Sequence, residues 1–211
     1  MLVVGLVGKQ RAGKGELSRL IREKIPEWID EKCFGKKISI ATPRFSDYPR
    51  EELARRGIPI SRDSMQKFVQ EMDKEALTRG EEAGALSREV KKRIELLKAA
   101  DLVIVDGVRW RPDEAMIRSF PQNLMVYVVA SAEDRYQRMT ESGENAGDTL
   151  KTFEEFLAED NAVNEQFIEE IGERADFTIQ NNEGLLRFKE KAGYFIFSEI
   201  VIARLLQKKC C

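Results

Sequence analysis

Histidine is absent from this chain of 211 residues, and cysteine and proline are scarce, with three and six copies. The absence of histidine excludes histidine-ligated zinc, a Ser-His-Asp triad and acid–base catalysis by imidazole. The three cysteines, two of them adjacent at the C-terminal end, are too few for a disulfide framework, which favours a reducing, cytoplasmic location. Any chemistry must then depend on lysine, arginine, carboxylates or a bound metal ion.

Long hydrophobic runs and an excess of one charge are also missing. No window approaches the roughly 18 consecutive apolar residues of a membrane span. The 35 basic and 37 acidic residues nearly cancel, to a formal charge of −2, so the composition gives no reason to expect a nucleic-acid or membrane partner. With 42% apolar residues, the chain is expected to form a single domain over residues 1–211.

Short apolar runs alternate with helical patterns along the chain. Several of the runs are unbroken, which is typical of parallel strands covered on both faces. Strands are expected at residues 2–7, 37–42, 102–106, 124–130 and 176–180. Helices are expected at residues 13–24, 61–78 and 86–99, after start signals at Pro112 and Ser131, and from Phe153 to about Gly172. This alternation predicts an α/β fold with helices on both faces of one sheet.

The first expected strand leads directly into Gly8-Lys9-Gln10-Arg11-Ala12-Gly13-Lys14-Gly15. This is the phosphate-binding pattern G-x-x-x-x-G-K, the P-loop, with glycine where serine or threonine is usual. Its glycines would let backbone N–H groups turn towards phosphate oxygens, and the following helix would point its N-terminus at the same charge. We therefore expect a nucleotide polyphosphate here, bound by Gly8, Arg11, Ala12, Gly13, Lys14, Gly15 and Glu16.

A second expected strand, Leu102-Val103-Ile104-Val105-Asp106, ends in a carboxylate. In a parallel sheet this acid would lie beside the glycine loop, where it could hold Mg²⁺ directly or through water. Gly15 removes the hydroxyl that usually ligates the metal, so Glu16 and Ser18 are the nearby candidates to replace it. The metal is assigned to Asp106, and the second protein ligand stays open.

Arginines gather at positions that can reach the same edge of the sheet. They are Arg109 shortly after Asp106, Arg135 and Arg138 three apart on one helical face, and Arg44, Arg50 and Arg62 in the irregular segment 43–62. Phosphoryl transfer requires spread positive charge to hold two phosphate groups in line, and the planar guanidinium suits this task. The placement favours phosphoryl transfer between two bound molecules.

These motifs resemble those of the nucleoside-monophosphate-kinase group of P-loop kinases. Glycine after the loop lysine is the form found in adenylate kinases, and Val105-Asp106-Gly107-Val108-Arg109 is similar to their D-G-F-P-R segment. The greatest likeness is to the dephospho-CoA-kinase-like branch, especially an archaeal nucleotide-kinase-like family. It also rests on residues 62–67, 152–160 and 175–184.

The resemblance implies a three-layer α/β/α sandwich with a five-stranded parallel sheet in the order 2-3-1-4-5. It assigns residues 43–80 to acceptor binding and residues from about 139 to 151 to a lid. ATP would lie over the glycine loop, with its base near Asn181 and Asn182 and with Arg138 in contact with it. The acceptor would meet Asp47, Arg50, Arg62, Gln66 and Arg109.

The resulting hypothesis is an ATP- and Mg²⁺-dependent kinase of a small nucleotide-type acceptor, with Lys14, Asp106 and Arg109 as catalytic residues. One alternative is a dephospho-CoA-kinase-like enzyme, in which Asp47 or Asp106 acts as base on a ribose hydroxyl. Another is a nucleotide-binding regulatory protein with little turnover, which the missing hydroxyl at Gly15 supports. The protein is expected to be a monomer or homodimer, and the apolar segment 194–206 is either a core helix or a dimer surface.

Overall fold

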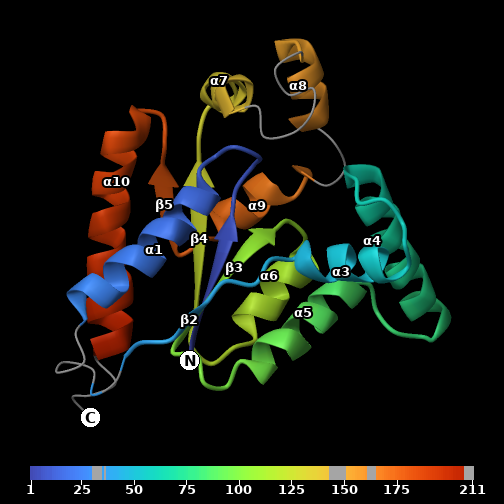
Figure 1. Ribbon diagram of the computed structural model, residues 1–211, viewed down its shortest axis with the longest axis horizontal. Helices are drawn as coiled ribbons and strands as arrows, with labels where there is room; N and C mark the ends of the chain where they lie inside the picture. Colours follow the sequence, from blue (N-terminus) through green and yellow to red (C-terminus); the bar gives the residue numbers. More distant parts are fainter. Residues whose placement is uncertain (30–34, 36, 143–150, 161–164, 207–211) are drawn as a thin grey trace.

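The computed structural model describes residues 1–29, 35, 37–142, 151–160 and 165–206. Its centre is a sheet of five parallel strands in the order β2-β3-β1-β4-β5 (Figure 1). The strands are β1 (Leu2–Val7), β2 (Ile40–Ala41), β3 (Leu102–Val108), β4 (Asn123–Val129) and β5 (Phe177–Gln180). The predicted α/β class and the predicted strand order are both confirmed.

Helices cover both faces of the sheet (Figure 1). One face carries α1 (Lys14–Trp28), α10 (Gly184–Phe195) and the π-helical continuation of α10, η3 (Ile196–Leu206). The other face carries α5 (Ala85–Leu96), α6 (Arg111–Arg118) and α9 (Ile168–Glu173). Together the helices and the sheet make the three layers that the resemblance implied.

Four further helices lie around the carboxyl end of the sheet and beside it. α7 (Ala132–Ser142) and α8 (Phe153–Asp160) lie beyond the carboxyl ends of the strands (Figure 1). α3 (Asp47–Arg55) and α4 (Arg62–Thr78) pack against each other and against α5, to one side. The carboxyl edge, where ligands bind in open α/β sheets, is therefore flanked by helices that come from four separate stretches of the chain.

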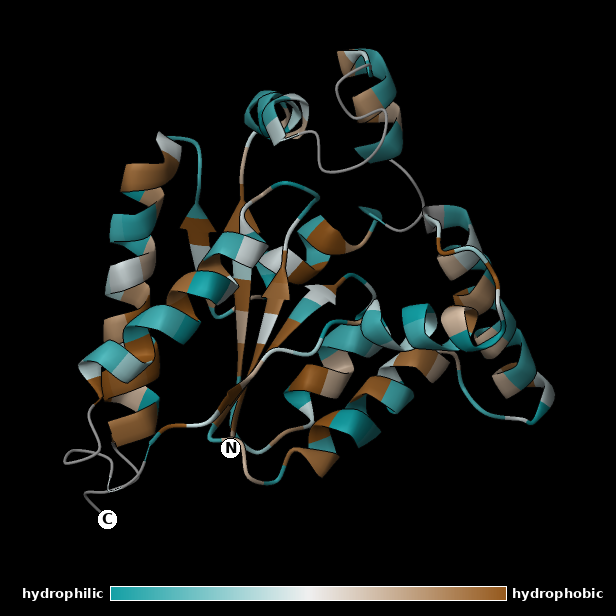
Figure 2. Cartoon of the chain, viewed as in Figure 1, coloured by the Kyte–Doolittle hydropathy of each residue, from teal (hydrophilic) through white to brown (hydrophobic). Residues whose placement is uncertain are grey.

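Alternating side chains of β1 supply two hydrophobic cores from one apolar run. Leu2, Val4 and Leu6 pack on the α1 side, whereas Val3 and Val7 pack on the α5 side. This is the two-residue period of a strand that is buried on both faces. Figure 2 shows hydrophobic colouring along the central strands and on the helices that cover them. The same burial holds β1 rigidly beneath the glycine loop that follows it.

The predictions for residues 37–42 and 153–172 were wrong in extent. At the sheet edge, β2 pairs with β3 over only Ile40–Ala41. The single helix predicted from Phe153 to Gly172 is two helices, α8 and α9. Phe167, which directly precedes α9, packs on Trp110 with ring centroids 5.5 Å apart, and residues 161–164 lie outside the described part of the chain. The helix predicted at 86–99 ends at Leu96.

Several predicted features fall partly or wholly outside the described residues. The segment assigned to a lid, about 139–151, is described only to Ser142 and again from Lys151. Cys33, Cys210 and Cys211 all lie outside the described part. Within that part, no helix is long and apolar enough to cross a bilayer. The division into one domain with an acceptor region at 43–80 stays a prediction.

Candidate functional site

The loop between β1 and α1 folds around its own lysine. The Nζ of Lys14 donates hydrogen bonds to the carbonyl oxygens of Gly8, at 2.6 Å, and Lys9, at 3.0 Å. Burial lowers the pKa of the Lys14 ammonium, while the neighbouring Asp106 carboxylate acts in the opposite direction. The loop thus holds a positive centre in place beside a buried carboxylate.

Two loop glycines adopt backbone conformations that side chains disfavour. Gly8 has a φ of 151° and Gly13 a φ of 114°. A Cβ at Gly8 would run into the carbonyl oxygen of Val128, and a Cβ at Gly13 would lie 2.5 Å from Nδ2 of Asn181. Left-handed and extended residues in succession turn backbone N–H groups to one side, the arrangement that binds oxyanions. The loop geometry therefore fits a polyphosphate.

Residues from distant parts of the chain brace this loop. Asn181 donates from Nδ2 to the carbonyl oxygen of Ala12 at 2.8 Å. Arg138, on α7, donates to the carbonyl oxygens of Arg11, at 3.3 Å, and Asn181. Asn182 accepts at Oδ1 from the backbone N–H of Ser131, 2.9 Å away, and so joins the end of β5 to α7. Arg138 and Asn181 thus contact the loop and Asn182 does not, and the contact of these residues with a nucleotide stays a prediction.

Asp106 lies at the carboxyl end of β3, beside the loop. Its Oδ1 is buried and has no hydrogen-bond partner within the described residues. Its charge is close enough to Lys14 to favour the protonated ammonium. Leaving a buried carboxylate oxygen unpaired costs free energy, so this atom is best explained by a ligand.

The donor set around Asp106 fits a magnesium ion that is bound together with phosphate. Within the described ranges, no group of three or more Cys, Asp or Glu side chains could enclose a metal ion. Magnesium commonly takes one or two protein carboxylates and completes its shell with phosphate oxygens and water. Asp106 is the residue that would hold it here, with the remaining positions left to the nucleotide and solvent.

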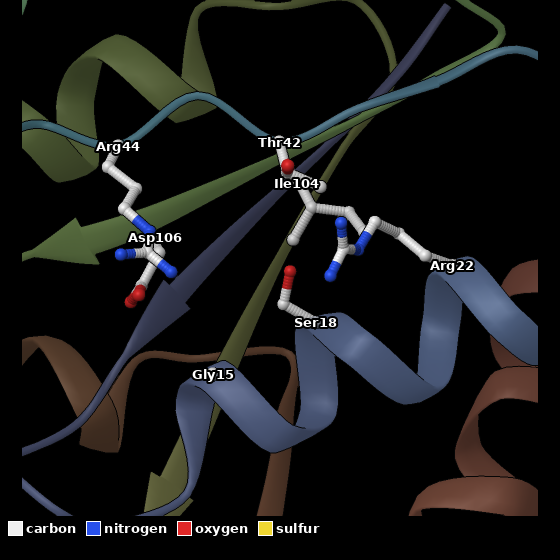
Figure 3. Close-up of a pocket in the computed structure, with 7 residues that line it drawn as sticks. All are labelled: Gly15, Ser18, Arg22, Thr42, Arg44, Ile104 and Asp106. Carbon is white, nitrogen blue, oxygen red and sulfur yellow. The ribbon is translucent and has the colours of Figure 1, made fainter. Parts of the chain in front are cut away.

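A pocket of about 80 Å³ opens next to Asp106, between α1 and the chain that follows β2 (Figure 3). It is lined by Gly15, Ser18, Arg22, Thr42, Arg44, Ile104 and Asp106. A Cβ at Gly15 would meet nothing within 4 Å, so the missing hydroxyl leaves open space rather than a filled contact. Ser18 lines this pocket, whereas Glu16 pairs with Arg19 at 2.6 Å. Of the two candidates to replace the hydroxyl, Ser18 is the one that faces the pocket of Asp106.

A larger cavity, of about 390 Å³, lies on the other side of the loop, between the end of β4 and α8. Asp160 of α8, which is 8% exposed, lies at its edge and accepts from both guanidinium nitrogens of Arg135, with Nη2 at 2.8 Å. Lys9 of the loop pairs with the same carboxylate at 3.1 Å and with Glu169 at 2.9 Å. This ion-pair network ties the loop to α7, α8 and α9.

Arg109 lies close enough to the loop for its charge to act on Lys14, and its catalytic role stays a prediction. Its charge lowers the pKa of Lys14. Its Nη1 donates to Oε1 of Glu165 at 2.9 Å, and that glutamate side chain is 2% exposed. Sequence reasoning missed Glu165 because the residue was placed inside a continuous helix.

Among the described side chains, no hydrogen bond or ion pair joins Asp47, Arg50 or Gln66 to Arg109. Asp47 accepts at Oδ2 from the backbone N–H of Arg44, 2.7 Å away, and so closes the turn that opens α3. Arg50 is exposed, and Gln66 lies in the second turn of α4. Arg62 begins α4, and its side chain is not among those described. The part of these residues in acceptor binding stays a prediction.

Sequence reasoning missed Arg22 and Thr42, and it named Arg44 only as one of several arginines that could reach this edge of the sheet. All three line the smaller pocket. One signal was present. Gly15, Ser18 and Arg22 are spaced i, i+3 and i+7, which places them on one face of α1. The approach of Thr42 and Arg44 to that face depends on the pairing of β2 with β3, which no local pattern reveals.

The fold and the loop first define the class: an α/β protein with the fold of the P-loop kinases. Two solved structures with this fold are the shikimate kinases from Bacteroides thetaiotaomicron (12% identical, TM-score 0.55, covering 92% of this chain and 96% of that chain) and Acinetobacter baumannii (16% identical, TM-score 0.51, covering 97% and 96%). TT1252 from Thermus thermophilus is also similar (19% identical, TM-score 0.52, covering 94% and 97%). At these identities the likeness concerns the fold.

More particularly, the chain belongs to the UPF0200 family. It is 30% identical over 208 residues to a UPF0200 protein of Pyrococcus abyssi, an alignment that covers 97% of each chain. A UPF0200 protein of Pyrococcus horikoshii is 27% identical over 193 residues, covering 90% of this chain and 93% of that one. A UPF0200/UPF0201 protein of Archaeoglobus fulgidus is 26% identical over 194 residues, 54% of its own length. No protein-family model matches the sequence.

Proposed function

We propose that this protein is a small-molecule kinase that transfers the γ-phosphoryl group of ATP to a nucleotide-type acceptor. The observation that carries the proposal is the placement of Asp106, whose buried, unpartnered oxygen lies beside the lysine of a phosphate-binding loop. The shared fold with two shikimate kinases supports phosphoryl transfer in general. The nucleotide acceptor is supported by the resemblance of the loop, of residues 105–109 and of residues 175–184 to monophosphate kinases.

In this proposal, the residues around the loop have separate roles in phosphoryl transfer. The loop N–H groups and Lys14 bind and neutralise the donor phosphates, while Arg138 and Asn181 keep the loop in shape. Magnesium, when bound, neutralises phosphate charge and orients the transferred group. Asp106 holds the metal, and Arg109 adds positive charge beside Lys14.

The position of Asp106 also bears on the dephospho-CoA-kinase-like alternative. That reaction needs a base near an acceptor hydroxyl, and Asp47 and Asp106 are the two candidates from the sequence. Asp47 already accepts a backbone hydrogen bond that closes a turn, whereas Asp106 has a free oxygen next to the loop. If the acceptor is a ribose hydroxyl, Asp106 is therefore the better base.

A coupled assay for ADP tests the proposal directly. Purified protein with Mg-ATP is offered nucleoside monophosphates, deoxynucleoside monophosphates and dephospho-CoA, one at a time. We expect ADP to form with one class of acceptor, and Lys14→Ala to reduce kcat/KM about 10²–10³-fold. Lys98→Gln removes an exposed positive charge from the connection between α5 and β3 and should leave turnover unchanged. Tight ATP binding with no turnover on any acceptor would overturn the kinase and favour the regulatory alternative.

A further inference from the structure

Two arginines without protein partners meet in the pocket beside the loop. Most described arginine side chains donate to a carboxylate or to a backbone carbonyl. Arg22 and Arg44 belong to the few that form neither a hydrogen bond nor an ion pair. Arg22 comes from α1 and Arg44 from the chain after β2, and both side chains extend into the same pocket (Figure 3). Most arginines of the described residues are thus paired, whereas these two unpaired arginines line the same pocket.

The rest of the pocket is suited to an oxyanion. The hydroxyls of Ser18 and Thr42 lie between the two guanidinium groups and make no hydrogen bond within the described residues (Figure 3). Guanidinium groups and hydroxyls are donors that phosphate and carboxylate groups accept, and the guanidinium fork can do so in bidentate fashion. The volume of about 80 Å³ accommodates one such group.

Asp106 does not neutralise this pair of arginines. It is the one acidic residue that lines the pocket, and it forms no ion pair with Arg44. Its charge acts on the buried ammonium of Lys14. The pocket is therefore left with an excess of positive charge, which an anionic ligand would balance.

The pocket extends away from the phosphate-binding loop. Ser18 and Arg22 follow Lys14 by four and eight positions on α1, and a helix rises about 1.5 Å per residue, so Arg22 lies about 12 Å further along the axis. A group held by Arg22 and Arg44 is thus distinct from the donor phosphates, which the loop and Lys14 hold. Asp106 borders both, because it lines this pocket and its charge acts on Lys14.

We infer that Arg22 and Arg44, with Ser18 and Thr42, form an anion subsite for a phosphate or carboxylate group of the acceptor. That the anion belongs to the acceptor rests on the proposed function, whereas the binding of an anion does not. The subsite selects acceptors that carry an oxyanion in addition to the group that is phosphorylated or that receives the phosphoryl group.

Calorimetric titration with inorganic phosphate, and separately with malonate, tests the subsite without turnover. The protein is first saturated with Mg-ADP, so that the loop is filled. Phosphate or malonate should bind the wild type, and Arg22→Gln and Arg44→Gln should each weaken that binding about tenfold or more. Both side chains are exposed and unpaired, so the variants should fold, which circular dichroism checks. Lys98→Gln, with the same loss of charge elsewhere, should bind as the wild type does.

The two anions also distinguish the sources of the ligand group, because tighter phosphate binding indicates a phosphorylated acceptor and tighter malonate binding a carboxylate. Equal anion binding by the wild type and both variants, or binding that disappears once Mg-ADP fills the loop, would overturn the subsite. Arginine-dependent anion binding by a protein that phosphorylates no acceptor would refute the proposed function and leave the subsite standing. If the protein is an active kinase and both variants keep the wild-type KM for the acceptor, the role of the subsite in acceptor binding is refuted and the proposed function stands.

Discussion

Gly15 is the residue at which the loop departs from its usual pattern, and the structure gives this departure a consequence. Serine or threonine here would place a hydroxyl beside the metal, whereas glycine leaves the pocket open towards Asp106. The unpartnered oxygen of Asp106 borders the same pocket. A metal ion bound by Asp106 would lack the usual protein hydroxyl, and the hydroxyls that line the same pocket are those of Ser18 and Thr42.

Gly15→Ser should be accepted by the fold and should change the use of magnesium. Serine in the first turn gains about 0.5 kcal/mol of helix propensity over glycine, and its Cβ meets no neighbour. Its hydroxyl would offer an oxygen beside Asp106, so the Mg²⁺ concentration that half-saturates ATP binding should fall. Magnesium titrations at fixed ATP measure this, with Gly15→Ala as the control that adds the Cβ alone. An unchanged magnesium requirement in the serine variant would contradict the placement of the metal.

The lowered pKa of Lys14 predicts that nucleotide binding weakens in mild alkali. Burial lowers this pKa from the ordinary 10.5 in the free protein, and bound phosphate would raise it again because it favours the charged ammonium. ATP affinity should therefore decline as the pH rises through the lowered pKa, at a pH below 10.5. Calorimetry between pH 7 and 10 measures the decline. Lys14→Arg, which stays charged, should show a flatter profile, and identical profiles would refute the argument.

At the scale of elements, one buried carboxylate joins a strand end to two helices. Asp113 accepts at Oδ2 from the backbone N–H groups of Arg109 and Trp110, both at 3.0 Å, and so caps the start of α6. Its Oδ1 accepts from the hydroxyl of Ser87 on α5 at 2.6 Å. Burial raises the pKa of Asp113 to about 6, although these three hydrogen bonds act against the shift.

Asp113→Asn should remove a pH-dependent part of the stability. Because the folded-state pKa lies above the ordinary 3.8, the native protein binds more protons than the unfolded chain between about pH 4 and pH 6. The contribution of Asp113 to stability therefore falls as the pH rises through that range, by on the order of 3 kcal/mol. Urea unfolding at pH 4, 5, 6 and 7 should show that the free energy of unfolding of the variant rises relative to that of the wild type as the pH rises. A constant difference would contradict the buried, protonated state.

Among the described residues, the carboxylate of Asp160 joins α8 to the glycine loop. Asp160→Asn leaves Arg135, which is 3% exposed, without its counter-charge, and breaking a buried pair in this way costs about 3–5 kcal/mol. Thermal unfolding should show the loss. The control is Glu190→Gln, whose pair with Arg187 is exposed on both sides and should contribute nothing measurable. Equal melting temperatures for both variants would show that α8 is held by other contacts.

The pKa of Asp160 sets the acidic pH below which its ion pairs with Arg135 and Lys9 are lost. Burial acts to raise this pKa, but hydrogen bonds from Arg135 and Lys9 lower it overall. A lowered pKa means that the carboxylate stabilises the fold above the ordinary value of 3.8 and that this stabilisation is lost as the pH falls through the lowered folded-state pKa. These ion pairs are therefore fully present at neutral pH, where the loop would have to bind its nucleotide.

At the scale of the whole molecule, the sequence predicted the sheet well because its central strands are buried on both faces. An unbroken apolar run such as residues 102–106 is typical of a parallel strand that is covered on both faces. Lys14 and Asp106 were predictable for a related reason, since each belongs to a local pattern. The ion pairs around the loop were not predictable, because Lys9–Asp160 and Arg109–Glu165 join residues that are 151 and 56 positions apart. The pocket lined by Arg22 and Arg44 was not predicted, because the two residues meet only through the pairing of β2 with β3.

The C-terminal helical segment supplies several side chains to the hydrophobic core on the α1 side of the sheet. Periodicity left residues 194–206 open between core and dimer surface, and the structure buries Phe195, Ile196, Ile200, Val201 and Leu205 against α1 and the sheet. Ile202, on the other side, is 48% exposed. Ile200→Ala should cost about 2–5 kcal/mol of unfolding free energy, because it leaves a cavity beneath the sheet.

Ile202→Ala removes the same atoms from solvent-exposed surface, so its cost should stay below about 1 kcal/mol. Urea unfolding of the two variants measures both values in one protein. Equal losses would mean that Ile202 is also buried, in a contact between copies of the chain. In that case the loss at Ile202 should shrink as the protein is diluted, because a contact between copies weakens with concentration. The loss at Ile200 should not, since it arises within one chain.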